Sequence, residues 1–251
     1  TTARKAVMTD TTAQPTDATA TAQEALIDTL CAGGHLRSTS VEEAFRAVPR
    51  HLFVPNATLE QAYADNVVSV KDDETGRSLS CASAPRIVAM MLEQAAVEPG
   101  MHILELGTGT GFNAALLAHL TGRNGSVVTV DVDQDLTDNA AARLAQAGAD
   151  NVEVVLGDGA EGHQPGAPYD LVVATVGSHQ VPAAWLRQLA PSGRLVAPIR
   201  IVGDVSRSIV FERAGDQRWC SVDSQLSTFM PLRDSIGDDT RAYTYPSTDG
   251  S

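Results

Sequence analysis

Cysteine is scarce in this chain of 251 residues, and aromatic residues make up only 4% of it. The three cysteines, Cys31, Cys81 and Cys220, lie far apart, form no Cys-X-X-Cys pair and have no histidine at metal-ligand spacing. A disulfide framework or a zinc site needs paired or clustered cysteines, so both are excluded. The pattern predicts a reduced, cytoplasmic protein that binds no metal.

Long apolar runs and basic residues are also in short supply. No apolar run approaches the roughly 20 residues that span a bilayer, and the first residues lack the apolar core of a signal peptide. The 18 basic residues stand against 31 acidic ones, which gives a net charge of −13. A surface of this charge repels phosphate backbones and anionic lipids, so neither a nucleic acid nor a membrane is expected as a partner.

The remaining composition is that of a globular protein, with 43% hydrophobic and 20% charged residues. A single domain of this size hides roughly 70–75% of the surface that its unfolded chain exposes, so it needs no disulfide or metal. We expect residues 1–21, which lack apolar periodicity, to be a disordered tail. One domain then spans 22–234, and the acidic stretch 235–251 is interpreted as a second tail, compatible with truncation of a longer chain.

The domain has two parts with different patterns. Residues 22–100 favour helices, because Leu26 and Leu30 lie near helical spacing and Ser40 is the expected N-cap of the next helix. In 101–234 short apolar strands alternate with helices, which is typical of a mostly parallel sheet with helices on both faces. The sequence therefore predicts an α/β, Rossmann-like fold with an N-terminal helical extension on the substrate side and a sheet on the cofactor side.

Seven strands and three intervening helices are expected in the second part. The predicted strands are Ile103–Leu106, Val127–Asp131, Val152–Leu156, Leu171–Val176, Arg194–Ile201, Ser208–Arg213 and Trp219–Met230. The predicted helices are Phe112–Leu120, Leu136–Ala147 and Val181–Ala190. No helix separates the last two strands, which meet across the turn Ala214-Gly215-Asp216, so this edge of the sheet should be antiparallel.

The most informative stretch joins the first of these strands to its helix through Gly107, Gly109 and Gly111. Glycine lets a ligand approach the backbone closely at a helix N-terminus, where free N–H groups point outward. A dinucleotide fingerprint has its third glycine one residue later, where this chain has Phe112. The loop therefore fits class I S-adenosylmethionine-dependent methyltransferases better than nicotinamide or flavin enzymes. Taken alone, it is also compatible with a tight strand-to-helix turn.

Acidic residues follow the next two strands. Asp131 ends a strand about 20 residues beyond the loop, where a carboxylate can accept hydrogen bonds from both ribose hydroxyls. Asp158 stands between Gly157 and Gly159 after the following strand, near the expected place of the adenine amino group. Because the carboxyl ends of parallel strands meet at one edge of a sheet, the loop and both acids predict a single cofactor site.

The run Asp131-Val132-Asp133-Gln134-Asp135 also resembles the start of a calcium loop. Such a loop needs glycine at its sixth position and glutamate at its twelfth, where this chain has Leu136 and Ala142. A calcium loop is therefore excluded. We interpret Asp133 and Asp135 as caps and as charge compensation for the dipole of the helix that follows.

Several longer strings are more particular than the glycine loop. They are VPRHLFVP at 48–55, AYAD at 62–65, Ser83-Ala84-Pro85, APYD at 167–170, Gln188-Leu189 and FMPL at 229–232. Together with the loop and Gly157-Asp158-Gly159, they resemble the protein-L-isoaspartate O-methyltransferases over nearly the whole predicted domain. The resemblance implies S-adenosyl-L-methionine as the cofactor and methyl transfer to an aspartyl or isoaspartyl carboxylate of a peptide or protein.

The resemblance also implies particular site residues. The cofactor contacts would be Glu105, Gly107, Gly109, Thr110, Gly111, Asp131, Val132, Asp158, Gly159 and Thr175. Ser83 would hydrogen-bond the acceptor carboxylate beside the methyl group, although a serine ahead of Pro85 is also an ordinary helix cap. A carboxylate is ionised at neutral pH and needs no general base, so we interpret His51 as a packing or hydrogen-bonding residue.

Three departures from the usual family pattern bear on the substrate. The run before Pro85 is Ser80-Cys81-Ala82-Ser83 where repair enzymes commonly have Thr-Ile-Ser, Phe112 stands where tyrosine is usual, and Arg233 stands where threonine is frequent. With residues 174–179, they resemble the actinobacterial relatives that tailor ribosomally made peptides such as lanthipeptides and graspetides, in which the methyl ester closes to a succinimide. Protein repair remains the alternative, and a nucleotide-linked oxidoreductase or a non-catalytic binding module are distant ones.

Overall fold

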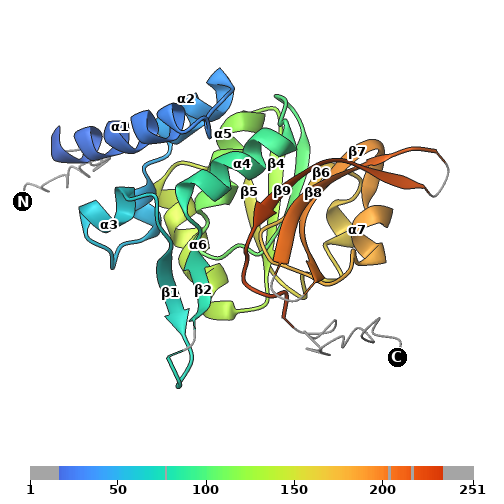
Figure 1. Ribbon diagram of the computed structural model, residues 1–251. Coiled ribbons are helices and arrows are strands. Elements are labelled where there is room, and N and C mark those ends of the chain that lie inside the picture. The colour runs from blue at the N-terminus through green and yellow to red at the C-terminus, as the bar shows by residue number, and fades with distance from the viewer. Residues whose placement is uncertain (1–16, 77, 203–204, 216–217, 234–251) are drawn as a thin grey trace, which may run out of the picture.

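The computed structural model of the chain describes residues 17–76, 78–202, 205–215 and 218–233 (Figure 1). Its elements in chain order are α1 (Asp17–Ala32), α2 (Thr39–Ala47), η1 (Arg50–Phe53), α3 (Leu59–Tyr63), β1 (Val68–Asp72), β2 (Ser78–Ala82), α4 (Pro85–Ala95), β3 (His102–Leu106), α5 (Phe112–Thr121), β4 (Ser126–Asp131), α6 (Gln134–Gln146), β5 (Val152–Leu156), η2 (Gln164–Gly166), β6 (Tyr169–Ala174), α7 (Ala183–Arg187), β7 (Leu189–Val202), β8 (Val205–Arg213) and β9 (Trp219–Ser227). Figure 1 shows the helices lying around a central sheet.

The central sheet contains the seven predicted strands in the order β5-β4-β3-β6-β7-β8-β9. The pairs from β5 to β7 are parallel, whereas β7–β8 and β8–β9 are antiparallel. The mostly parallel sheet and its antiparallel edge are therefore confirmed. Because β3 lies between β4 and β6, the loops that leave these strands at their carboxyl ends come together, and a ligand site is expected there.

Helices pack on both faces of the sheet, but unequally. One face, with Ile103 and Val127, forms a large core with α1, α2, α4 and α5. The other face, with Leu104 and Val128, packs against Trp185 of α7 and the loops beside it. Alternate residues of each strand thus face two different cores, as the period of a β-strand requires. The N-terminal helices share a core with the sheet, and Phe45 of α2 contacts Phe112, the first residue of α5.

Helix α1 begins at Asp17, so the prediction of a disordered tail over 1–21 is wrong for residues 17–21. These residues include two alanines, which have the strongest helix propensity, and they extend the helix backwards by five residues. The rest of that tail and the acidic stretch 235–251 lie outside the described residues. The N-cap of α2 is Ser38 rather than Ser40, since the Ser38 side chain accepts a hydrogen bond from Val41 N.

Two further elements differ from the predictions. The predicted helix Val181–Ala190 is shortened to α7, because β7 begins at Leu189 and pairs there with Tyr169 of β6. Helix propensity yields here to pairing within the sheet. The hairpin of β1 and β2 was not predicted, and its strands pair in an antiparallel register from Val68↔Ala82 to Asp72↔Ser78. It extends beside α6 (Figure 1).

Candidate active site

The glycine loop runs from the end of β3 to the first residue of α5, and Gly107 is its tightest point. Gly107 has a φ of +100°, and a Cβ there would lie 2.6 Å from Thr175 Oγ1 and 2.8 Å from Val176 Cγ1. Residues that carry a side chain rarely adopt this φ, and contacts this short would force a neighbouring atom to move. Thr175 Oγ1 donates to the Gly107 carbonyl at 2.6 Å. The loop backbone is thus left bare toward the site and is held from the end of β6.

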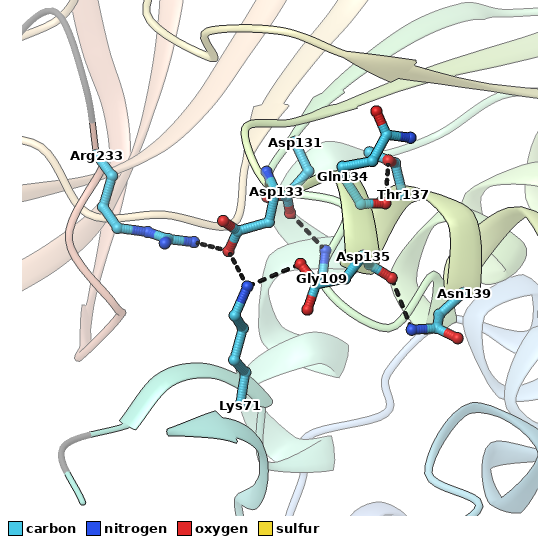
Figure 2. A network of polar contacts seen from close by, with 9 residues as sticks. All are labelled: Lys71, Gly109, Asp131, Asp133, Gln134, Asp135, Thr137, Asn139 and Arg233. Carbon is cyan, nitrogen blue, oxygen red and sulfur yellow. Dashed lines mark hydrogen bonds and ion pairs between the residues drawn. The ribbon is translucent and has the colours of Figure 1, made fainter. Parts of the chain in front are cut away.

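Asp131 at the end of β4 faces this loop. Its side chain is 8% exposed, and its Oδ2 accepts a hydrogen bond from Gly109 N at 2.9 Å (Figure 2). Its Oδ1 accepts from Asp133 N at 3.2 Å. A carboxylate offers about four lone-pair sites, so acceptor capacity remains for two ribose hydroxyls. Both the bare backbone at Gly107 and this carboxylate fit the predicted cofactor.

Two small cavities meet at the glycine loop, and they share Gly107 and Thr175. The first cavity, of about 70 Å³, contains six of the predicted cofactor residues: Gly107, Gly109, Asp131, Val132, Gly159 and Thr175. The second cavity, of about 60 Å³, is lined by Ser83 and Thr110, together with Phe229 near the end of the described chain. After the roles that the sequence predicts for their lining residues, we call them the cofactor cavity and the acceptor cavity. The structure therefore places Ser83 and Asp131 in two different cavities that meet at Gly107.

Three predicted cofactor residues line neither cavity. Gly111 is the N-cap of α5, and a Cβ there would lie 3.3 Å from Ala140 Cβ of α6, so its lack of a side chain serves helix packing. Asp158 Oδ1 accepts a hydrogen bond from Ala160 N at 2.8 Å and so shapes the turn that presents Gly159. The third is Glu105, which has a different environment.

Glu105 is fully buried beneath the loop. Its carboxylate accepts hydrogen bonds from Asn113 Nδ2 at 2.8 Å and from Thr129 Oγ1 at 2.6 Å, and Thr129 Oγ1 is also 2.8 Å from Thr108 Oγ1. Burial raises the pKa of Glu105 to about 7, although both hydrogen bonds favour the ionised form. Glu105 thus ties α5 and β4 to the underside of the loop.

Ser83 lies between β2 and α4 and is free of the capping role that the sequence also allowed. The N-cap of α4 is Ala84, which has no capping side chain, and at this helix end the backbone N–H of Arg86 donates instead to Asp65 Oδ1 at 2.9 Å. The Ser83 carbonyl accepts a hydrogen bond from Arg50 Nη2 at 2.9 Å. The backbone of Ser83 is therefore fixed, while its side chain borders the acceptor cavity.

Arg50 is the residue that sequence reasoning missed in the string VPRHLFVP. Its side chain is 1% exposed, its Nε donates to the Ala62 carbonyl at 3.0 Å, and its guanidinium carbon lies 5.0 Å from the ring centre of Phe112. Burial lowers the pKa of Arg50 to about 10, so it stays charged at neutral pH. It joins α3, the Ser83 segment and the start of α5. In the sequence, the only sign of this role is that Arg50 belongs to the string VPRHLFVP, which resembles the family.

His51 has the role that the sequence suggested. Its Nδ1 lies 2.9 Å from the Tyr63 hydroxyl, and partial burial lowers its pKa. His51 lines neither the cofactor cavity nor the acceptor cavity. It is a hydrogen-bonding residue that packs η1 against α3.

The interpretation of Asp133 and Asp135 holds in part. Asp133 is the N-cap of α6 and Asp135 lies in its first turn, where both charges can compensate the helix dipole, but the side chain of Asp133 makes no capping bond. Its Oδ2 instead forms ion pairs with Arg233 Nη2 at 2.6 Å and with Lys71 Nζ at 3.4 Å (Figure 2). Lys71 also reaches Asp135 Oδ1 at 2.7 Å. These ion pairs join segments up to 100 residues apart, which explains why spacing along the chain did not indicate them.

Similarity to known proteins agrees with this geometry. The profile of the family described as protein-L-isoaspartate(D-aspartate) O-methyltransferase matches residues 21–237. Protein-L-isoaspartate O-methyltransferase 2 of Archaeoglobus fulgidus is 39% identical over 206 residues, which are 80% of this chain and 88% of that protein. The protein-L-isoaspartate O-methyltransferase of Pyrococcus horikoshii is 39% identical over 173 residues, which are 69% of this chain and 75% of that protein.

Solved structures are similar in fold. One protein-L-isoaspartate O-methyltransferase has a TM-score of 0.76 and 30% identity over 86% of this chain and 67% of its own. A Plasmodium falciparum structure in complex with S-adenosyl-L-homocysteine has a TM-score of 0.73 over 85% of this chain and 99% of its own, and at 16% identity it shows the fold alone. The sheet order and the glycine-loop site define a class I S-adenosylmethionine-dependent methyltransferase. The chain belongs to the protein-L-isoaspartate O-methyltransferase family.

Family membership confirms the predicted fold, cofactor and enzyme class, and it decides against a nucleotide-linked oxidoreductase. Within the described residues no cluster of three or more acidic, histidine or cysteine side chains could hold a metal ion. In the same part of the chain, no helix is both long and apolar enough to cross a membrane.

Proposed function

We propose that this chain methylates the side-chain or isoaspartyl carboxylate of an aspartyl residue in a peptide or protein. The observation that carries the proposal is the position of Ser83 in the acceptor cavity, which shares Gly107 and Thr175 with the cofactor cavity. A hydroxyl there can donate a hydrogen bond to an acceptor carboxylate and hold it near the loop. Alignment of reacting groups can by itself supply several kcal/mol of the barrier reduction.

The lining of the acceptor cavity suits a reaction between an anion and a cation. S-adenosyl-L-methionine supplies a methyl group on a positively charged sulfur. The described residues that line this cavity include no titratable side chain, and Val88, Met91 and Phe229 give it an apolar wall. A carboxylate is already ionised at neutral pH, so no base is required. Because opposite charges cancel as the bond forms, an environment poor in water favours the reaction.

Ser83→Ala should lower kcat/KM for the peptide roughly 10- to 100-fold, because it removes one hydrogen bond to a charged group. The Kd for S-adenosyl-L-homocysteine should stay within about twofold, since Ser83 does not line the cofactor cavity. Steady-state kinetics and calorimetry check the two values, and Ser83→Thr, which keeps a hydroxyl, is the matched control. Loss of cofactor affinity as large as that of Asp131→Ala would refute this division of roles.

We further propose an aspartyl residue of a ribosomally made, cyclised peptide as the acceptor. Three departures from the usual family pattern support it, because they lie around the site: Cys81 borders the cofactor cavity, Phe112 packs against Phe53, and Arg233 pairs with Asp133. Backbone nitrogen would then attack the methyl ester and expel methanol, which leaves a succinimide. Protein repair is the second candidate, and it is supported by the curated relatives, which are described as protein-L-isoaspartate O-methyltransferases.

Mass spectrometry with two acceptors tests the choice between these substrates. The protein and S-adenosyl-L-methionine are mixed with an isoaspartyl peptide and with a cyclised precursor peptide encoded beside this gene. We expect a methyl ester, or the succinimide derived from it, on the cyclised peptide alone. Modification of the isoaspartyl peptide alone would assign the chain to repair and overturn the narrower proposal.

A further inference from the structure

Two segments outside the central sheet line part of the cofactor cavity, which is partly open to solvent. Leu79, Ser80 and Cys81 of β2 line it on one side, and residues 230–233, which we call the C-terminal strap, line it on another. At about 70 Å³, the cavity is far smaller than the roughly 300–1,000 Å³ of ordinary small-molecule sites. A nucleoside cofactor therefore needs more room than this lining leaves, and the hairpin and the strap are the two parts of the lining that lie outside the central sheet and its loops.

The strap is anchored at two points. At one end, Gly177 N donates to the Met230 carbonyl and Leu232 N donates to the Gly177 carbonyl, each at 2.7 Å. At the other end, Arg233 Nη2 reaches Asp133 Oδ2 at 2.6 Å. Between them, Leu232 lies so close to Gly159 that a Cβ on this glycine would be 3.2 Å from Leu232 Cδ1. The strap thus crosses the cavity from the end of β6 to the start of α6.

The hairpin reaches the same carboxylate. Lys71 Nζ of β1 lies 3.4 Å from Asp133 Oδ2 and 2.7 Å from Asp135 Oδ1 (Figure 2). Asp133 is therefore shared by a cation from each covering segment. Partial burial alone would raise the pKa of Asp133, but the hydrogen bond and charge of Arg233, together with Lys71, hold it below its usual value. The carboxylate is thus ionised at neutral pH, and both cations attract it.

Asp133 also connects these contacts to the cofactor residues. Its backbone N–H donates to Asp131 Oδ1 at 3.2 Å, while Gly109 N donates to Asp131 Oδ2 at 2.9 Å. A residue whose side chain is held by two cations keeps this N–H in place. The ion pairs can therefore influence both the cover of the cavity and the orientation of its acidic residue.

We propose that Arg233, Asp133 and Lys71 form an electrostatic clasp that closes the cofactor cavity and limits how fast S-adenosyl-L-methionine and S-adenosyl-L-homocysteine exchange. Arg233 and Lys71 are positioning residues in this scheme, because they act through the hairpin, the strap and Asp133. The inference rests on the cavity being the cofactor site.

The side chains of the clasp are more enclosed than those of an ordinary surface ion pair. Asp133 is 19% exposed, Lys71 29% and Arg233 32%, and both cations meet one oxygen. Single exposed pairs contribute little, and salt screens them. Here the hairpin and the strap are both tied to Asp133, and the hairpin also to Asp135, so an opening that frees both must break all three ion pairs. We therefore expect a moderate effect on exchange rates that depends on ionic strength.

Stopped-flow measurement of S-adenosyl-L-homocysteine binding and release tests the clasp. Arg233→Gln and Lys71→Gln should each raise the association and release rate constants together, roughly 3- to 10-fold at low salt, so that Kd changes less than either rate. High salt should speed exchange in the unchanged protein and have less effect in the variants. Arg233→Lys, which keeps the charge, should restore most of the slow exchange.

The matched control is Arg46→Gln, which breaks the ion pairs of Arg46 with Glu24 and Glu42. Arg46 lines neither cavity. Its exchange rates should equal those of the unchanged protein, and thermal melts show that every variant is folded. Unchanged rates in both clasp variants, or an equal change in Arg46→Gln, would overturn the clasp. So would faster release without faster association, since Arg233 would then be a simple affinity contact. Failure of the unchanged protein to bind would instead refute the cofactor assignment.

Discussion

Asp131→Ala should weaken binding of S-adenosyl-L-methionine roughly 100- to 10,000-fold. The Asp131 carboxylate is 8% exposed at the end of β4, lines the cofactor cavity and is aimed at the glycine loop by Gly109 N. Two hydrogen bonds from ribose hydroxyls to a charged acceptor contribute about 1.5–3 kcal/mol each. When both are lost, the two factors by which Kd rises multiply. Isothermal titration calorimetry measures the change directly.

The matched control for this prediction is Asp138→Ala, which removes the same charge from an exposed site on α6 that lines neither cavity. Its Kd should stay within about twofold of the unchanged value. Asp131→Asn should fall between the two, because it keeps the shape of the side chain but loses its charge. An unchanged Kd in Asp131→Ala would mean that the cofactor lies elsewhere.

Stability should fall as the pH rises from 5 to 8, and Glu105→Gln should remove most of that fall. Burial raises the pKa of Glu105 from 4.5 to about 7 in the folded state. Because the folded-state pKa is the higher one, the stabilisation is complete below pH 4.5 and is lost as the pH passes 7. The shift corresponds to about 3 kcal/mol, since each pKa unit is about 1.4 kcal/mol.

Urea unfolding at several pH values checks this effect in both proteins. Glutamine stays neutral at every pH, can accept a hydrogen bond from Asn113 and can donate one to Thr129, so the network around it persists. Other groups also titrate in this range, but they are common to both proteins, and the difference between the two curves isolates Glu105. Parallel curves would show that the carboxyl is ionised in the folded protein across the whole range.

The strands were predictable because each is a short apolar run bounded by glycine, proline or polar residues. All seven form the central sheet, and β5 has the predicted bounds Val152–Leu156. The hairpin of β1 and β2 escaped prediction, since its strands carry serine, lysine and aspartate as well as valine. The helix predicted from 181 to 190 has strong helix formers, but Leu189 pairs with Tyr169 in the sheet.

The candidate site was predictable where its signals are local. The glycine loop and Asp131 are found at the expected strand ends, because glycine spacing and a strand-end acid can be recognised along the chain. Glu105 was harder to interpret, since a strand buried on both faces does not reveal which side chain faces a ligand. Arg50 and Ser83 are 33 residues apart, and Arg233 and Asp133 are 100 apart, so only the folded chain shows these contacts.

The kind of bond that the transferred methyl group forms tests the central claim most directly. The protein is incubated with S-adenosyl-L-methionine and with the isoaspartyl and cyclised aspartyl peptides together, and S-adenosyl-L-homocysteine is quantified beside the methanol released by mild alkali. A carboxyl methyltransferase yields both products in equal amounts, because methyl esters hydrolyse in alkali or close to a succinimide. S-adenosyl-L-homocysteine without methanol would place the methyl group on another atom, and absence of both products would contradict the proposed activity.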